Sequence, residues 1–287
     1  MFSQSEQTRC ICCRGRLLRL LVALVIANPL LFKPVLADDR AADAADALAN
    51  SKGNLILGVA WIPDYIGSDD YQPVPMIISN FYLAGYKGIF EGTGGRLDVW
   101  DHPYLEAGPV LNLSLPRDDI DSRAVELVGE FDAAIEAGAY LGFAIPYTDL
   151  PEGLLSGYIQ FRSAVGNEQE GTQFLSQLEY FYAPKFFLRV GFTVTAIAAD
   201  SDYNNFQFGV SSAASERSGL PAFRAGGGAR DVAVAAYSVL SLSPRVGIFT
   251  RVLASRVLGD ARRSPIVSQE GSDEQFFLGV GMFFNFL

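Results

Sequence analysis

The chain has 287 residues, a formal net charge of −10, 12% aromatic residues and 19% charged residues. This acidic balance argues against a nucleic-acid-binding surface, which needs clustered Lys and Arg. The only histidine is His102, next to Pro103, and the sequence contains no G-x-S-x-G, H-E-x-x-H or phosphate-loop motif. We therefore expect a protein that is not an enzyme and that uses no cofactor or metal.

The first 37 residues have the layout of a secretory signal. Four arginines precede a short apolar core at 20–27, and small residues at Val35 and Ala37 offer a cleavage site. This order of basic, apolar and small residues predicts a cleavable signal peptide over residues 1–37. A membrane anchor is the alternative, but Asn28 and Pro29 make the apolar run shorter than the roughly 18 residues that a spanning helix needs.

Cleavage would change the charge and the thiol content of the chain. Five of the 22 basic residues and one of the 32 acidic residues lie before residue 38, so 17 basic and 31 acidic residues remain, a net charge of −14. All three cysteines, Cys10, Cys12 and Cys13, would leave with the signal. Residues 38–52 are polar and rich in alanine, and we expect them to form a flexible periplasmic leader.

From residue 53 onward, the chain alternates apolar and polar residues between turn signals. The clearest case is 275–286, where Phe276, Leu278, Val280 and Met282 share one face with two further phenylalanines. A period of two with one wholly apolar face is typical of a strand that faces lipid. The same pattern predicts twelve strands, at 54–62, 74–81, 86–91, 96–100, 104–115, 133–145, 154–163, 172–182, 185–197, 230–242, 245–254 and 275–286.

The predicted connections alternate in length. Tight turns or short links at 83–85, 101–103, 146–153, 183–184 and 243–244 alternate with long links at 63–73, 116–132, 164–171, 198–229 and 255–274, and only 92–95 breaks the pattern. Short periplasmic turns and long extracellular loops are characteristic of outer-membrane barrels. We therefore predict an all-β fold: a closed antiparallel transmembrane β-barrel of about 12 strands at 53–287, in the lipid of a bacterial outer membrane. Period two also fits a soluble β-sandwich, but the signal, the terminal strand and the turn asymmetry favour the barrel.

If lipid lies outside, the alternate residues line the lumen. The charged candidates are Arg96, Asp98, Glu106, Glu136, Arg162, Glu179, Arg189, Arg245 and Arg251. Charges of both signs have two interpretations, an aqueous selective pore or a packed, salt-bridged interior. Twelve strands fall between the filled eight-stranded and the open sixteen-stranded barrels, so both interpretations stay open.

The first long link carries a recognisable motif. Pro63, Asp64, Tyr65, Gly67, Ser68 and Tyr71 belong to the run PDYIGSDDY, which is followed by Pro-Val-Pro at 73–75. This run resembles the first loop of the MipA/OmpV family (MltA-interacting protein), and 108–113, 129–138 and 203–212 are similar to later stretches of that family. Physically, Pro63 would end a strand and Gly67 would allow a turn with positive φ. A structured loop that latches the barrel mouth is favoured over a ligand site.

The resemblance implies an outer-membrane barrel with an interaction role. It implies a scaffold in the periplasm for a murein hydrolase and a murein synthase, which would link peptidoglycan cleavage with synthesis. It implies no catalytic or partner-binding residue that could be transferred to this sequence. The alternative function is a passive, weakly selective channel for small solutes.

Overall fold

A computed structural model describes residues 53–286 except 84–85, 101, 119, 148–152 and 166–168. The described residues all belong to one compact unit, Arg40–Leu287. The predicted signal peptide and leader lie outside the described residues. Among the helices that are described, none is long and apolar enough to cross a bilayer.

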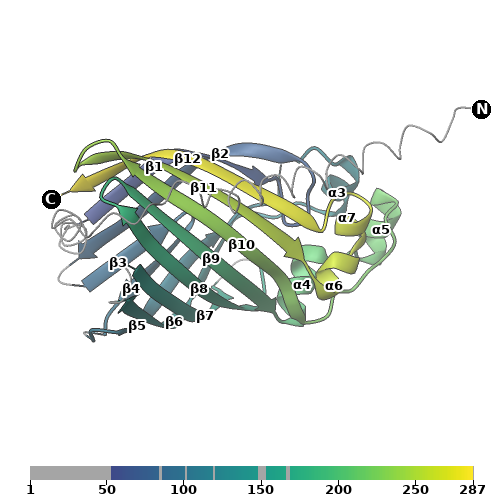
Figure 1. Ribbon diagram of the computed structural model, residues 1–287. Helices are drawn as coiled ribbons and strands as arrows, with labels where there is room; N and C mark the ends of the chain where they lie inside the picture. The colour runs from purple at the N-terminus through teal and green to yellow at the C-terminus, as the bar shows by residue number, and fades with distance from the viewer. Residues whose placement is uncertain are drawn as a thin grey trace, which may run out of the picture. The chain divides into compact units, whose positions relative to one another are not determined.

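Twelve antiparallel strands close into a barrel in which each strand pairs with its neighbours in sequence and β12 pairs with β1, as the alternation predicts (Figure 1). The strands are β1 (Gly53–Pro63), β2 (Tyr71–Leu83), β3 (Tyr86–Glu91), β4 (Gly94–Asp98), β5 (Leu105–Ser114), β6 (Ala134–Tyr147), β7 (Gly153–Ala164), β8 (Thr172–Lys185), β9 (Leu188–Ala199), β10 (Gly228–Ser241), β11 (Val246–Val257) and β12 (Glu274–Phe286). Closure leaves no free sheet edge at the β1–β12 seam, which is the requirement for a sheet that spans hydrocarbon.

The last strand shows how side chains at alternate positions form the outer and the inner surface of the barrel. Its outward residues Phe276, Leu278 and Val280 are exposed, whereas the alternate residue Phe283 is buried inside the barrel. At the seam Gly58 pairs with Gly281. A Cβ at Gly58 would lie 2.1 Å from the carbonyl oxygen of Val280, so only glycine allows the strands to approach this closely.

Several predicted strand limits are wrong at the turns. The expected turn at Ala183 and Pro184 does not form, because β8 continues to Lys185 through a register shift after Tyr182, and the reversal falls at residues 186–187. A proline is tolerated there because the irregular pairing requires no N–H from it. β4 ends at Asp98 rather than at Trp100, and β11 begins at Val246 rather than at Arg245.

One part of the inner face of the barrel is apolar. On the side formed by β1, β2 and β10–β12, Ile56, Met76, Val239, Phe249 and Phe283 form an apolar cluster. The charged inner residues lie mainly on β3–β9, and two arginines stand at the boundary: the guanidinium of Arg189 lies 5.8 Å from the Phe283 ring centroid, and that of Arg251 lies 5.8 Å from the Phe277 ring centroid. Side chains therefore fill one side of the lumen.

The long links gather at one end of the barrel, as the turn asymmetry predicts (Figure 1). They were expected to be loops, and this expectation is wrong, because three of them contain short helices: α3 (Arg123–Val128), α4 (Ser201–Phe208), α5 (Ser212–Ser218), α6 (Gly259–Arg263) and α7 (Pro265–Ser268). Side chains of Ser122, Asp200 and Ser211 accept backbone N–H bonds at the starts of α3, α4 and α5. These N-caps stabilise helices too short to form alone.

The helices and links share a hydrophobic core of their own. Ile120 and Val125 from the β5–β6 link pack with Val210 and Leu220 from the β9–β10 link and with Ile266 from the β11–β12 link. Tyr65 of the β1–β2 link packs against this cluster. We call the four links together the cap: residues 64–70, 115–133, 200–227 and 258–273. Because β5–β6 and β11–β12 lie on opposite sides of the barrel, the cap extends across its mouth.

Candidate functional site

Polar contacts also join the cap links across the mouth. Arg117 Nη1 donates to the carbonyl oxygen of Gln207 at 2.8 Å, and Ser264 Oγ donates to that of Phe208 at 2.7 Å. Ser122 Oγ donates to Glu270 Oε2 at 2.9 Å. Each of these bonds connects two different links, so the cap is a single folded layer held by apolar packing and by buried hydrogen bonds.

The first-loop motif joins the β1–β2 link to the rest of the cap. Tyr65 OH donates to the Glu270 carbonyl at 3.0 Å, and Ser68, which is buried, holds the turn by accepting from the Asp70 N–H. Gly67 has φ 101°, and a Cβ there would lie 2.5 Å from Val267 Cγ2. Pro63 ends β1, and Tyr71 OH accepts from the Phe276 N–H at 3.0 Å. These contacts join the first loop to the β11–β12 link and to β12.

Burial shifts the ionisation of three cap residues. It raises the pKa of Tyr65 to about 12 and lowers the pKa of Arg117 to about 10, because each charged form loses water in the cap. Burial also raises the pKa of Asp64, and the nearby Asp121 and Asp70 carboxylates raise it further. The cap thus disfavours charge at its contact with the first loop.

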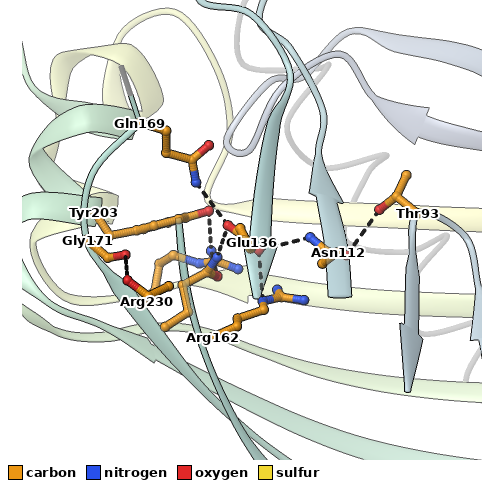
Figure 2. Close-up of polar contacts among 10 residues, drawn as sticks. Thr93, Asn112, Glu136, Arg162, Gln169, Gly171, Tyr203 and Arg230 are labelled. Carbon is orange, nitrogen blue, oxygen red and sulfur yellow. Dashed lines mark hydrogen bonds and ion pairs between the residues drawn. The ribbon is translucent and has the colours of Figure 1, made fainter. Parts of the chain in front are cut away.

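Beneath the cap, Glu136 is the centre of a buried polar network (Figure 2). Its carboxylate, in a residue 1% exposed, accepts from Asn112 Nδ2 at 2.9 Å, Gln169 Nε2 at 2.9 Å and Gln173 Nε2 at 2.7 Å. Arg162 Nε lies 3.0 Å from Glu136 Oε2. Three amide donors and one cation fully occupy the carboxylate, which is how a buried charge is tolerated.

The network continues from β8 to β10, which lies two strands further along the barrel. Arg230 Nη1 donates to Gln173 Oε1 at 2.6 Å and to Tyr203 OH at 3.1 Å, while its Nε lies 2.5 Å from Asp231 Oδ2. Burial raises the pKa of Tyr203, so its hydroxyl stays protonated. The network connects β5–β8 and β10 to Tyr203 in the cap helix α4, and it supports the cap from the lumen side.

A cavity of about 720 Å³ occupies the part of the lumen that lies away from the cap. Of the predicted lumen-lining residues, Arg96, Glu106, Glu179, Arg189 and Arg251 line it. Several of these charges have polar partners: Arg251 pairs with Glu91, Tyr237 donates to Glu179, and Lys87 Nζ lies 2.6 Å from Glu106 Oε1. Arg96 lies 4.3 Å from the Tyr158 ring centroid. Pairing of this kind stabilises charged side chains inside the barrel.

Two further predicted lumen residues have other positions. Asp98 Oδ1 accepts from the N–H groups of Trp100 and Ala107, each at 3.1 Å, and so stabilises the end of the β4–β5 ladder. Arg245 is exposed in the bend between β10 and β11, outside the strand in which the sequence analysis put it. His102 Nδ1 accepts from the N–H groups of Tyr104 and Leu105, which gives it a structural role in its turn.

A second cavity, of about 310 Å³, lies between the network and the cap. Glu136, Arg162 and Arg230 line its floor, and Tyr65 and Arg117 come from the cap. Sequence reasoning identified Glu136 and Arg162 but missed Gln169, Tyr203 and Arg230. Arg230 stands at the start of a predicted strand, so alternation could have found it, whereas Gln169 and Tyr203 lie in links that show no periodicity.

Comparison with known proteins gives one family and several distant folds. No curated protein sequence matches the chain significantly. Similar solved structures include the NanC porin, with 9% identity and a TM-score of 0.44 over 80% of this chain and 98% of that one. They also include OmpT of Vibrio cholerae (8%, 0.37, 82% and 96%) and the toluene transporter TbuX of Ralstonia pickettii (10%, 0.35, 84% and 91%).

The family comparison agrees with the resemblance of the first-loop motif. The model of the family described as "MltA-interacting protein MipA" matches residues 55–286, which is nearly the whole barrel. Together with the closed sheet and its apolar outer face, this match places the protein in the bacterial outer membrane. The chain belongs to the MipA family of outer-membrane β-barrels.

Proposed function

We propose that this barrel is a non-enzymatic interaction protein that binds a murein hydrolase, and with it a murein synthase, at its periplasmic end. The match to the family model carries this proposal, because the family is described as interacting with MltA. The position of the cap supports it: the folded layer covers the outer mouth, and the short turns remain accessible on the periplasmic side.

One periplasmic turn is well suited to contact a partner. Residues 99–104 join β4 to β5, and Val99, Trp100 and Tyr104 are exposed there. The ring centroids of Trp100 and His102 lie 5.7 Å apart, and those of His102 and Tyr104 lie 6.3 Å apart. Exposed aromatic side chains that contact one another offer contact area at a low cost in conformational entropy, a feature of protein-binding surfaces.

Site-specific photo-crosslinking in intact cells tests this proposal. A photoreactive amino acid at Trp100 or at Pro244, both in short turns, is expected to capture a murein hydrolase. The same residue at Ser212, exposed at the start of α5 in the cap, is the control and should capture none. Recovery of murein enzymes at Ser212 as often as at the turns, or at none of these positions, would refute the proposal.

A passive channel is the second candidate, and the 720 Å³ lumen cavity favours it. Such a channel requires a water path past Arg162, Arg189 and Arg251, and through or around the cap. Conductance across a planar bilayer separates the two functions, because binding a periplasmic partner requires no ion flow.

A further inference from the structure

The barrel wall is interrupted above the β3–β4 hairpin. This hairpin ends at the turn of Gly92 and Thr93, where the Gly92 N–H donates to Ile77 O at 2.9 Å and the Leu113 N–H donates to Thr93 O at 3.0 Å. Pairing between β2 and β3 ends at Ile78 and Glu91, yet β2 continues to Tyr71 beside β1. Toward the cap, neither β3 nor β4 continues between β2 and β5. At the usual strand spacing, β2 and β5 are therefore about 14 Å apart there.

Two prolines of β2 lie beside this gap. In an antiparallel strand, the N–H and C=O of one residue point to the same neighbour, and residues alternate between neighbours. Because Ile77 O faces the hairpin, Pro75 and Pro73 face the same side, where no strand pairs with them. Proline has no N–H, so β2 presents two fewer unpaired donors at an opening that faces lipid.

The opening has a complete frame and leads to the cavity beneath the cap. The hairpin turn is its lower edge, β2 and the end of β5 are its sides, and the Asp64 carboxylate, hydrogen-bonded to the backbone of Asp121, closes it above. Leu113 and Leu115 are 43% and 48% exposed on the lipid-facing side and also line the 310 Å³ cavity. Thr93, at the lower edge, is the outermost member of the Glu136 network, since its hydroxyl donates to Asn112 at 3.3 Å (Figure 2).

The charged side chains that line the cavity are Arg117, Arg162 and Arg230 and the carboxylates Asp64 and Glu136, and Asp231 pairs with Arg230. Arg117 is 4% exposed and donates to the carbonyls of Gly129 and Gln207, and it forms no ion pair with any described residue. Three of its five N–H groups are occupied, and two remain for another acceptor. Glu136 is matched by Arg162, and Arg230 is matched by Asp231. A buried cation without a carboxylate, beside an apolar opening, suits an anionic headgroup attached to an apolar chain.

We propose that this opening admits a long-chain carboxylate from the outer leaflet, with its carboxylate at Arg117 and its chain leaving past Leu113 and Pro75 into lipid. The cavity holds about the volume of ten water molecules, enough for the headgroup and the first methylenes. The binding site is independent of the proposed periplasmic partner. It uses the surfaces that the cap and the short hairpin create together.

Photolabelling of the full chain in phosphatidylcholine vesicles tests the proposal. The probe is a long-chain fatty acid with a photoreactive group, used beside the alcohol of the same chain length. The fatty acid is expected to label peptides carrying residues 71–77 or 113–117 more strongly than peptides from the lipid-facing strands β7 and β10. Thr93→Trp, which fills the lower edge of the opening, should reduce this labelling at least about tenfold, a change of 1.4 kcal/mol in binding.

Three comparisons make the experiment decisive. Leu242→Trp adds the same ring at an exposed position in the bend after β10, near the other end of the barrel, and should leave the labelling unchanged. Arg117→Gln should reduce labelling by the acid to the level of the alcohol, and Arg117→Lys should restore part of it. Retention of the folded gel mobility identifies variants whose barrel is intact. Even labelling around the barrel, equal labelling by acid and alcohol, or competition by acetate alone would overturn the proposal.

Discussion

At the scale of single residues, Glu136 shows how a buried charge can organise a membrane barrel. It has four polar partners from four different segments, and its removal would leave Arg162 without a counter-charge. Removing one partner of a buried, hydrogen-bonded ion pair lowers the free energy of unfolding by more than the intact pair contributes to it. The reason is that the remaining charge stays buried without a partner. The loss of Glu136 should therefore reduce stability by more than the loss of its own hydrogen bonds.

Glu136→Ala is expected to lower the free energy of unfolding by about 3 kcal/mol, and Glu136→Gln by less because one acceptor oxygen is kept. Guanidinium unfolding in vesicles, followed by the fluorescence of Trp61 and Trp100, measures the change. Glu126→Ala, which breaks the exposed pair with Arg123, is the control and should change the free energy by under about 1 kcal/mol. Equal effects of the two alanine variants would contradict the structural role of the network.

At the scale of elements, the cap is a small folded unit, and we expect its stability to depend on pH through Asp64. Because burial and the Asp121 and Asp70 carboxylates raise its pKa, the closed cap binds a proton more tightly than the opened cap does. This stabilisation is fully present below the ordinary pKa of 3.8 and is lost as pH rises through the raised value. The sign is thus opposite to that of a salt-bridged aspartate.

Proteolysis of the β1–β2 link should therefore become faster as pH rises above about 4, once the protease's own pH dependence is corrected with an unfolded reference peptide. Asp64→Asn should reduce this dependence, since an amide oxygen can still accept the bond from Asp121 without becoming charged. The difference between the two proteins isolates Asp64 from the other carboxylates of the cap. Identical pH profiles would show that Asp64 does not control the opening.

At the scale of the whole molecule, two layers of contacts lie in series at one end of the barrel. The cap links pack together at the mouth, and the Glu136 network joins β5–β8 and β10 beneath them. We expect the full chain to show no stepwise conductance in planar bilayers. Ile266→Asp places a carboxylate in the centre of the cap core, where Ile266 is fully buried, and should open the cap and produce conductance steps.

Ser212→Asp adds the same charge at an exposed cap position and should remain silent. Large steps from the unmodified chain would favour the channel over the periplasmic interaction protein. Silence of Ile266→Asp, with the barrel still folded, would show that the network alone closes the lumen. The measurement thus also determines which of the two layers is the barrier.

Much of the fold could be predicted because membrane barrels obey a strict local rule. Each strand must present an apolar residue to lipid at every second position, so the number of strands, their faces and the order of long and short links follow from alternation. The turn at Ala183 and Pro184 was wrong because irregular pairing allows a strand to continue through a proline. The cap helices were missed because helices of four to eight residues show little periodicity, and their packing partners lie in other links.

The sequence by itself determined the barrel, its outer apolar face and, through the first-loop motif, its family, because these depend on residues close together in the chain. Only the tertiary structure decided that four links share one core over the mouth and that Glu136 meets Gln169 and Gln173. It alone placed Pro73 and Pro75 beside an opening in the wall. These features depend on which distant segments meet, and local patterns carry no information about contacts between segments that pack only after the barrel has closed.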